Sequence, residues 1–136
     1  MTRLLPDTNV LVYETVEDSP HHTTAARIVD EAREIILLPI VLHEYIWVMV
    51  KKLGVDPWIV AEKIREYLSD RRVRYAPEPP SVLVSALRML REMGLAPREV
   101  NDLIILAAAR QYGAVLATFD EKLRRVAQRL GVRVVP

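Results

Sequence analysis

Short, mainly apolar segments alternate with longer amphipathic segments along almost the whole chain of 136 residues. Segments such as Glu34–Leu38 and Ala114–Ala117 are too short for typical helices and do not alternate apolar with polar side chains. Strands of this kind are buried on both faces, as in parallel sheets whose strands are joined by helices. The pattern therefore predicts an α/β fold of three layers, α/β/α, with a mostly parallel central sheet.

The expected strands are Leu4–Leu5, Glu34–Leu38, Val73–Tyr75, Ala114–Ala117 and Val132–Val135. A polar turn, Asp7-Thr8-Asn9, leads from the first strand into a helix, and Pro6 stands at the strand end because it lacks a backbone donor. Further helices are expected over residues 21–32, 39–53, 57–68, 81–93, 97–112 and 118–130. In such folds ligands bind beyond the carboxyl ends of the strands.

Length and composition favour one globular domain covering residues 1–136. Hydrophobic residues make up 51% and charged residues 27% of the chain, which is not the composition of a disordered protein. The absence of cysteine excludes disulfides and thiolate metal sites and makes the cytoplasm the expected location. We expect no membrane span and no secretory signal. The net charge of +1 does not decide whether nucleic acid is a partner.

Four acidic residues lie where an isolated charge has little to stabilise it: Asp7, Glu44, Asp102 and Asp120. Asp7 follows a buried strand, and Glu44 lies inside a helix that is apolar nearly all round. The other two adjoin the apolar segments 103–109 and 114–117. A buried carboxylate costs several kcal/mol unless it is paired, and no Lys or Arg stands three or four residues beyond Asp7, Glu44 or Asp102. A shared hard cation, Mg²⁺ or Mn²⁺, would satisfy these oxygen ligands.

Each acid also has a purely structural interpretation. Asp7 could cap the following turn, and Asp102 could interact with a helix dipole, with Asn101 as the N-cap. Residues 118–121 fit a capping box in which Thr118 is the N-cap and Glu121 reaches back to it, which would release Asp120 from capping. Glu44 is the hardest to explain structurally, because its helix offers little contact with water.

Basic and aromatic residues suggest contacts outside this acidic group. Lys122, Arg125 and Arg129 recur along the last helix beside Asp120, so they are candidates for gripping phosphates, or else a solvated face. We expect the second arginine cluster, Arg71, Arg72 and Arg74, to be a solvated face, and none of the three histidines to bind metal. Tyr45, Trp47, Met49 and Trp58 are candidates for the core or for a subunit interface.

The sequence resembles the PIN-domain family, in particular the VapC-type toxins of prokaryotic toxin–antitoxin pairs. The resemblance rests on Leu-Leu-Pro-Asp7-Thr8-Asn9, on Glu44, on Asn101-Asp102-Leu-Ile-Ile-Leu and on Leu116-Ala-Thr118-Phe-Asp120, and it extends over essentially the whole chain. It implies endoribonuclease activity dependent on magnesium or manganese, with products carrying a 5′ phosphate and a 3′ hydroxyl. It also implies that Asn9 and Thr118 orient the acids. The departure from the family pattern is Glu121-Lys122-Leu123 directly after Asp120, which leaves open whether Asp120 contacts the metal directly.

A toxin of this kind implies an RNA substrate, a small antitoxin protein as partner and a homodimer, which we expect to form through the apolar surface between Ile40 and Trp58. Two other functions within the family are a stand-alone RNA-processing nuclease and a non-catalytic domain that binds RNA or a partner. A phosphoacceptor signalling domain has a similar sheet, but it needs paired acids after the first strand and a lysine after the last. Asp7 has no acidic neighbour, and the chain ends Val-Val-Pro.

Overall fold

The computed structural model describes residues 3–136 and contains a five-stranded sheet with helices between the strands. The strands are β1 (Arg3–Pro6), β2 (Glu34–Leu37), β3 (Val73–Tyr75), β4 (Val115–Ala117) and β5 (Val134–Val135). The α-helices are α1 (Thr8–Thr15), α2 (His22–Glu31), α3 (Pro39–Ile46), α4 (Pro57–Ser69), α5 (Pro80–Glu92), α6 (Val100–Tyr112) and α7 (Glu121–Arg129). A π-helical segment, η1 (Trp47–Lys52), continues α3, and a short 3₁₀ turn, η2 (Pro97–Glu99), precedes α6.

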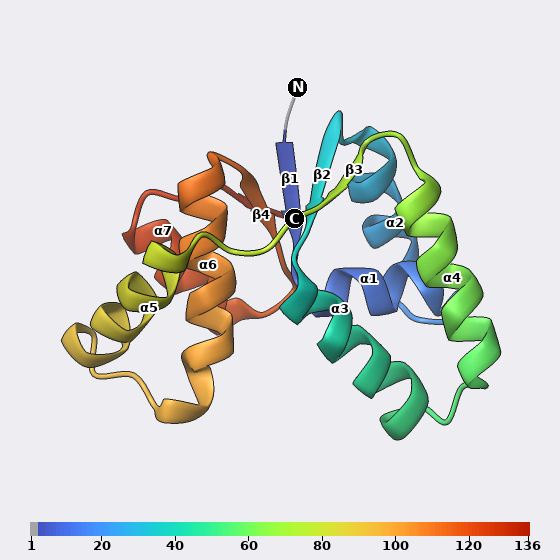
Figure 1. Ribbon diagram of the computed structural model, residues 1–136, viewed down its shortest axis with the longest axis horizontal. Coiled ribbons are helices and arrows are strands. Elements are labelled where there is room, and N and C mark those ends of the chain that lie inside the picture. Colours follow the sequence, from blue (N-terminus) through green and yellow to red (C-terminus); the bar gives the residue numbers. More distant parts are fainter. Residues whose placement is uncertain (1–2) are drawn as a thin grey trace.

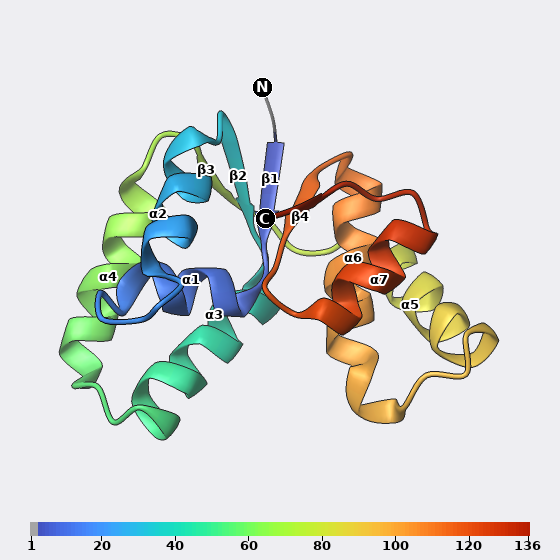
Figure 2. The same cartoon turned by 180° about the vertical axis from the view of Figure 1, so that it is seen from behind.

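All strand pairings within the sheet are parallel, in the order β3-β2-β1-β4-β5. Helices α1 to α4 lie on one side of the molecule and α5 to α7 on the other, with the strands between them (Figures 1 and 2). This arrangement confirms the three-layer α/β/α fold with a parallel central sheet. β1 lies in the middle, and Pro6 at its end pairs with Ala117 of β4. The carboxyl ends of β1 and β4 therefore stand side by side.

The core explains why the strands read as continuous apolar segments. Leu5, Ile36 and Leu116 are fully buried in three adjacent strands, and consecutive residues of each strand are buried in turn. Helices cover both faces of the sheet, so neither set of alternating side chains reaches water. No helix among residues 3–136 is long and apolar enough to cross a membrane.

The structure corrects three of the expected boundaries. Helix α1 begins at Thr8, so residues 7–9 form a helix start rather than a separate turn. The expected helix over 39–53 changes to π-helical geometry at Trp47. The last helix begins at Glu121 instead of Thr118, because Thr118 still donates its backbone N–H to Val135 O at 2.9 Å in the manner of a sheet residue.

Candidate functional site

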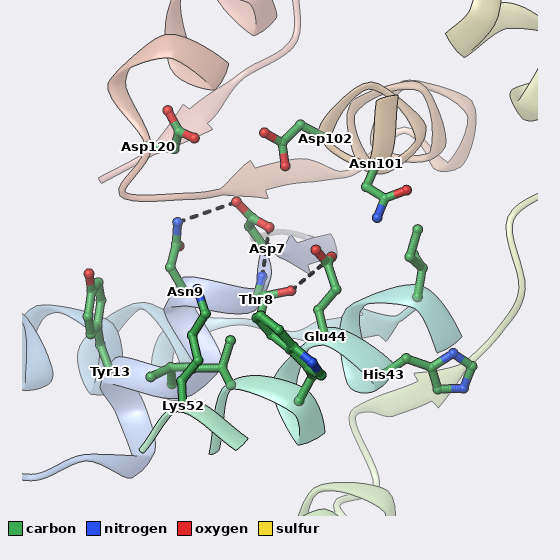
Figure 3. A pocket seen from close by; sticks show the side chains of 14 residues that line it. Asp7, Thr8, Asn9, Tyr13, His43, Glu44, Lys52, Asn101, Asp102 and Asp120 are labelled. Carbon is green, nitrogen blue, oxygen red and sulfur yellow. Dashed lines mark hydrogen bonds between the residues drawn. The ribbon is translucent and has the colours of Figure 1, made fainter. Parts of the chain in front are cut away.

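A pocket of about 560 Å³ opens beyond the carboxyl ends of β1 and β4, and all four predicted acids line it (Figure 3). Asp7 follows β1, Glu44 lies on α3, Asp102 lies in the first turn of α6 and Asp120 precedes α7. The fold thus brings together residues that are more than 110 positions apart in the sequence. In Figure 3, Asp102 and Asp120 lie on one side of Asp7, and Glu44 lies on the other.

Asp7 is held in one orientation by hydrogen bonds from residues that follow two neighbouring strands, β1 and β4. Its carboxylate accepts the backbone N–H of Thr8 at 2.7 Å and the hydroxyl of Thr118 at 2.9 Å, and the Asn9 amide lies 3.4 Å away. Asp7 is therefore the N-cap of α1 as well as a pocket residue. Only 5% of it is exposed. Burial raises the pKa of Asp7, against the effect of these hydrogen bonds, and the nearby Asp120 raises it further.

Glu44 faces the same pocket from the apolar helix α3. The Thr8 hydroxyl donates to its carboxylate at 3.3 Å, so the helix start after β1 contacts two of the acids. Burial and the charge of Asp7 raise the pKa of Glu44. Thr8 was not singled out by the sequence, because a threonine after an N-cap has an ordinary helical explanation.

The ionised form of Asp102 is strongly disfavoured where it lies. Burial is the largest cause, and together with the charges of Asp7, Asp120, Glu44 and Glu99 it raises the pKa of Asp102 from 3.8 to about 7. Its side chain forms no hydrogen bond within residues 3–136. Asn101 is not the N-cap that the structural alternative for Asp102 included. Glu99 takes that position, although without a side-chain capping bond, because η2 leads directly into α6. The carboxyl of Asp102 is therefore open to a ligand.

Asp120 has a capping role that the sequence interpretation assigned elsewhere. Its carboxylate accepts the backbone N–H groups of Lys122 at 2.9 Å and Leu123 at 3.2 Å, so Asp120 itself is the N-cap of α7. The predicted capping box on Thr118 and Glu121 is wrong, because Thr118 is paired in the sheet. The Thr118 hydroxyl instead accepts the N–H of Asp120 at 3.1 Å and donates to Asp7.

Asn9 and Thr118 link the two strand ends that carry acids. Asn9 Oδ1 accepts the backbone N–H of Phe119 at 3.2 Å, while its amide nitrogen lies 3.4 Å from both Asp7 Oδ2 and Thr118 Oγ1. Thr118 is fully buried. These contacts hold the loop before Asp120 against the end of β1. The positioning role that the resemblance implied for both side chains stays a prediction.

The donor set suits a hard divalent cation. Every acidic group is an oxygen ligand, each of the three resolved carboxyl pKa values is raised, and a positive ion would offset both burial and repulsion. Within residues 3–136, however, no three His, Cys, Asp or Glu side chains stand close enough to hold an ion as they are placed. The residues that would hold such an ion are Asp7, Glu44, Asp102 and Asp120.

Comparison with known families decides the membership of the chain, since a sequence model of the PIN domain matches residues 4–129. The chain belongs to the PIN-domain family. None of the curated proteins compared with it matches its sequence. The family match agrees with the resemblance that the four acidic segments carry.

Solved structures of low sequence identity share the fold of this PIN domain. VapC20 from Mycobacterium tuberculosis, described as a sarcin-ricin loop cleaving toxin, is 18% identical with a TM-score of 0.75, covering 90% of this chain and 94% of its own. VapBC2 from Rickettsia felis, bound to a DNA fragment from its promoter, is 19% identical with a TM-score of 0.71 and coverage of 98% and 97%. FitAcB from Neisseria gonorrhoeae is 21% identical with a TM-score of 0.64 and coverage of 98% and 96%.

The pocket of this PIN domain also contains residues that sequence reasoning did not select, among them Lys52, Tyr13 and His43. The basic candidates on α7 lie elsewhere. Lys122, Arg125 and Arg129 are exposed and do not line the pocket. Lys122 forms an ion pair with Glu99, which is largely buried, and lowers the pKa of that carboxyl. Contact between these three side chains and RNA stays a prediction.

Proposed function

We propose that this PIN domain is an endoribonuclease dependent on Mg²⁺ or Mn²⁺ and that it is the toxin of a VapBC-type toxin–antitoxin pair. The observation that carries the proposal is the meeting of Asp7, Glu44, Asp102 and Asp120 in one pocket, where burial and mutual repulsion raise carboxyl pKa values. Helix capping accounts for Asp7 and Asp120 one at a time, but it gives no reason for four carboxyl groups to meet, whereas cation binding does. The related fold of a toxin described as cleaving the sarcin-ricin loop supports RNA as the substrate class.

The four acids are the residues that would hold the ion, and each contributes differently. When bound, a divalent ion lowers the pKa of water and offsets phosphate charge, which is the chemistry that phosphodiester hydrolysis needs. Asp7 is fixed by Thr8 and Thr118 and gives the site a rigid side. Asp102 is not fixed by hydrogen bonds. Since its pKa is about 7, about half of these carboxyl groups are protonated at pH 7, and ion binding would release that proton.

We further propose that the protein works in the cytoplasm with a small antitoxin and as a homodimer. The neighbouring folds include toxin–antitoxin complexes, which supports an antitoxin partner. If no small reading frame lies beside the gene, a stand-alone RNA-processing nuclease becomes the better assignment. A PIN domain that only binds RNA or a partner would keep the fold without needing all four acids.

Cleavage of structured and single-stranded RNA in manganese tests the proposed activity. We expect the wild type to cut RNA, EDTA to stop it, and Asp102→Asn to abolish it. Asp18→Asn provides a matched control, since Asp18 is exposed and outside the pocket. An Asp102→Asn protein that cuts RNA at the wild-type rate would contradict the proposal.

Thermal unfolding tests cation binding without relying on activity. An ion at 100 times its Kd stabilises the wild type by about 2.7 kcal/mol, and the Asp102→Asn variant should gain less. In EDTA the variant should be as stable as the wild type or more stable, because the repulsion is reduced. An equal response of both proteins to manganese would show that Asp102 is not a ligand.

A further inference from the structure

The π-helical turn after α3 places two side chains together that an α-helix would separate. In η1 the backbone N–H of Leu53 bonds to Val48 O, five residues earlier, at 2.9 Å. At 3.6 residues per turn, positions five apart point about 140° away from each other. Here Lys52 Nζ lies 4.8 Å from the ring centroid of Trp47, the residue five positions before it. Such π turns are rare in proteins, and those that do occur are often found at functional sites.

Both side chains belong to the wall of the acidic pocket. Trp47 is 50% exposed, whereas Tyr45 and Met49, on either side of it in the sequence, are buried in the core. Tyr45 and Met49 thus provide the core contacts of this helical segment, and the indole of Trp47 remains at the pocket. A large aromatic ring that remains exposed beside a polar cavity is suited to contact with a ligand.

Lys52 has the charge that an anionic substrate needs. Among the described residues that line the pocket it is the one lysine or arginine, and its ammonium group forms no ion pair with a described carboxylate. Figure 3 shows Lys52 on the opposite side of Asp7 from Asp102 and Asp120. An RNA strand that brings one phosphate to the acids would run past this side chain.

We infer that Trp47 and Lys52 form a nucleotide subsite, in which the indole stacks on an unpaired base of the RNA and the ammonium group binds a backbone phosphate next to the one that is cut. The inference rests on the proposed function. Base stacking on an exposed aromatic ring, with a nearby cation for the backbone, is how proteins bind single-stranded nucleic acid. The subsite makes single-stranded RNA, or an unpaired loop, the class of substrate.

Binding of a short fluorescent single-stranded RNA tests the subsite apart from cleavage. The measurement uses the Asp102→Asn background in magnesium, so that the RNA stays intact. Trp47→Ala should weaken binding roughly 5- to 100-fold, the range expected for losing one stacked base, and Trp47→Phe should retain most of the affinity. Lys52→Met should reduce the dependence of log Kd on log salt by about 0.7. An RNA that lacks the base of the stacked nucleotide should have the same Kd for Trp47→Ala as for the parent protein.

Two exposed residues outside the pocket give matched controls. Tyr75 lies on β3 with 51% of its surface exposed, Lys51 is exposed beside Lys52, and neither lines the pocket. Tyr75→Ala and Lys51→Met should leave affinity and salt dependence unchanged. The subsite is overturned if Trp47→Ala and Lys52→Met equal these controls, if the parent binds no RNA, or if Trp47→Ala only releases a bound protein partner.

The outcomes separate the subsite from the proposed function. If the wild type cuts RNA in manganese while Trp47→Ala binds RNA as the controls do, the subsite fails and the nuclease assignment stands. If the wild type cuts no RNA but its affinity for RNA depends on Trp47 and Lys52, the nuclease assignment fails and the subsite is retained as part of an RNA-binding domain.

Discussion

Asp102 makes the stability of the metal-free protein dependent on pH. Its pKa is about 7 in the folded state and 3.8 without the fold, so between these values the folded protein keeps a proton that the unfolded chain has lost. Its contribution to stability is complete below about pH 4 and disappears as the pH rises through 7. In EDTA we expect the free energy of unfolding to fall by about 1 to 2 kcal/mol over this interval, allowing for screening of a partly exposed carboxyl.

Denaturant unfolding at a series of pH values measures this slope. Asp102→Asn should flatten it, whereas the exposed control Asp18→Asn should not. In manganese the slope should change sign, because the ion binds the ionised carboxylates and gains affinity as they lose protons. Identical slopes for the wild type and Asp102→Asn in EDTA would mean that water compensates for the burial of this carboxyl.

Two substitutions at Asp120 separate its cap from its proposed role in cation binding. Asn caps helices as well as Asp does, whereas Ala costs about 1 kcal/mol. In EDTA we expect Asp120→Asn to unfold with nearly wild-type stability and Asp120→Ala to lose about 1 kcal/mol. Both should weaken manganese binding, measured by calorimetry. A wild-type affinity for manganese in Asp120→Asn would make Asp120 a cap only.

Individual site residues differ in how far the sequence could predict them. Asp7, Glu44 and Asp102 could be selected because a charge in an apolar segment requires a physical reason. The cap at Asp120 was assigned to Thr118 instead, since local spacing does not show that Thr118 remains paired with β5. Lys52 was missed because a lysine near a helix end has an ordinary explanation as a solvated side chain, and α-helical periodicity places it about 140° from Trp47 rather than beside it.

At the scale of elements, Arg72 connects the end of α2 to the start of β3. One of its terminal guanidinium nitrogens donates to the backbone oxygens of Val29 at 2.8 Å, Asp30 at 3.2 Å and Ala32 at 3.0 Å, where α2 has no further helical partners. Asp70 accepts from the other guanidinium nitrogens, and this contact lowers the pKa of its carboxyl. The expected solvated face is therefore wrong for Arg72, which serves as a cap for the helix end.

Replacing Arg72 should therefore affect stability much more than replacing its neighbour. Arg72→Met removes hydrogen bonds to several carbonyl groups at once, and we expect a loss of about 2 to 3 kcal/mol in the free energy of unfolding. Arg71→Met is the matched control because Arg71 is exposed, and its effect should stay within about 0.5 kcal/mol. Equal losses of stability for Arg72→Met and Arg71→Met in denaturant unfolding would show that packing, and not the Arg72 hydrogen bonds, holds the end of α2.

Most element types followed from the sequence, while the change within the long helix did not. Residues 39–53 are apolar in a pattern that favours a continuous helix, and nothing in Val-Met-Val-Lys-Lys marks a π turn. The turn depends on tertiary contacts: it leaves Met49 in the core and lets Val55 donate to Met49 O at 2.9 Å. Propensity rules describe local preferences, so a geometry held by distant packing lies outside them.

For the whole molecule, the parallel sheet was predictable but the order of its strands was not. Continuous apolar strands joined by helices require a parallel sheet with both faces covered. Which strands become neighbours depends on contacts between segments that are far apart in the chain. The pairing of β1 with β4 brings Asp7 to Thr118, 111 positions away, and so creates the site. The sequence showed which acids needed an explanation but gave no distances among them.

Assembly provides the last prediction, because the structure leaves two apolar surfaces exposed. One includes Trp58 and Ile59 at the start of α4, where Trp58 ends the segment 40–58 that is expected to form a homodimer and Ile59 follows it. The other includes Leu83 and Leu87 on α5. Large exposed apolar patches favour association.

If the first surface forms the dimer, the double substitution Trp58→Glu and Ile59→Glu should yield a monomer at micromolar concentration in light scattering. Two carboxylates buried in an apolar contact would raise the dimer Kd by roughly a hundredfold or more. The matched substitutions Leu83→Glu and Leu87→Glu should leave the dimer intact. Dissociation by the α5 pair alone would place the interface on α5 and show the expected surface to be wrong, and a monomeric wild type would remove the homodimer from the proposal.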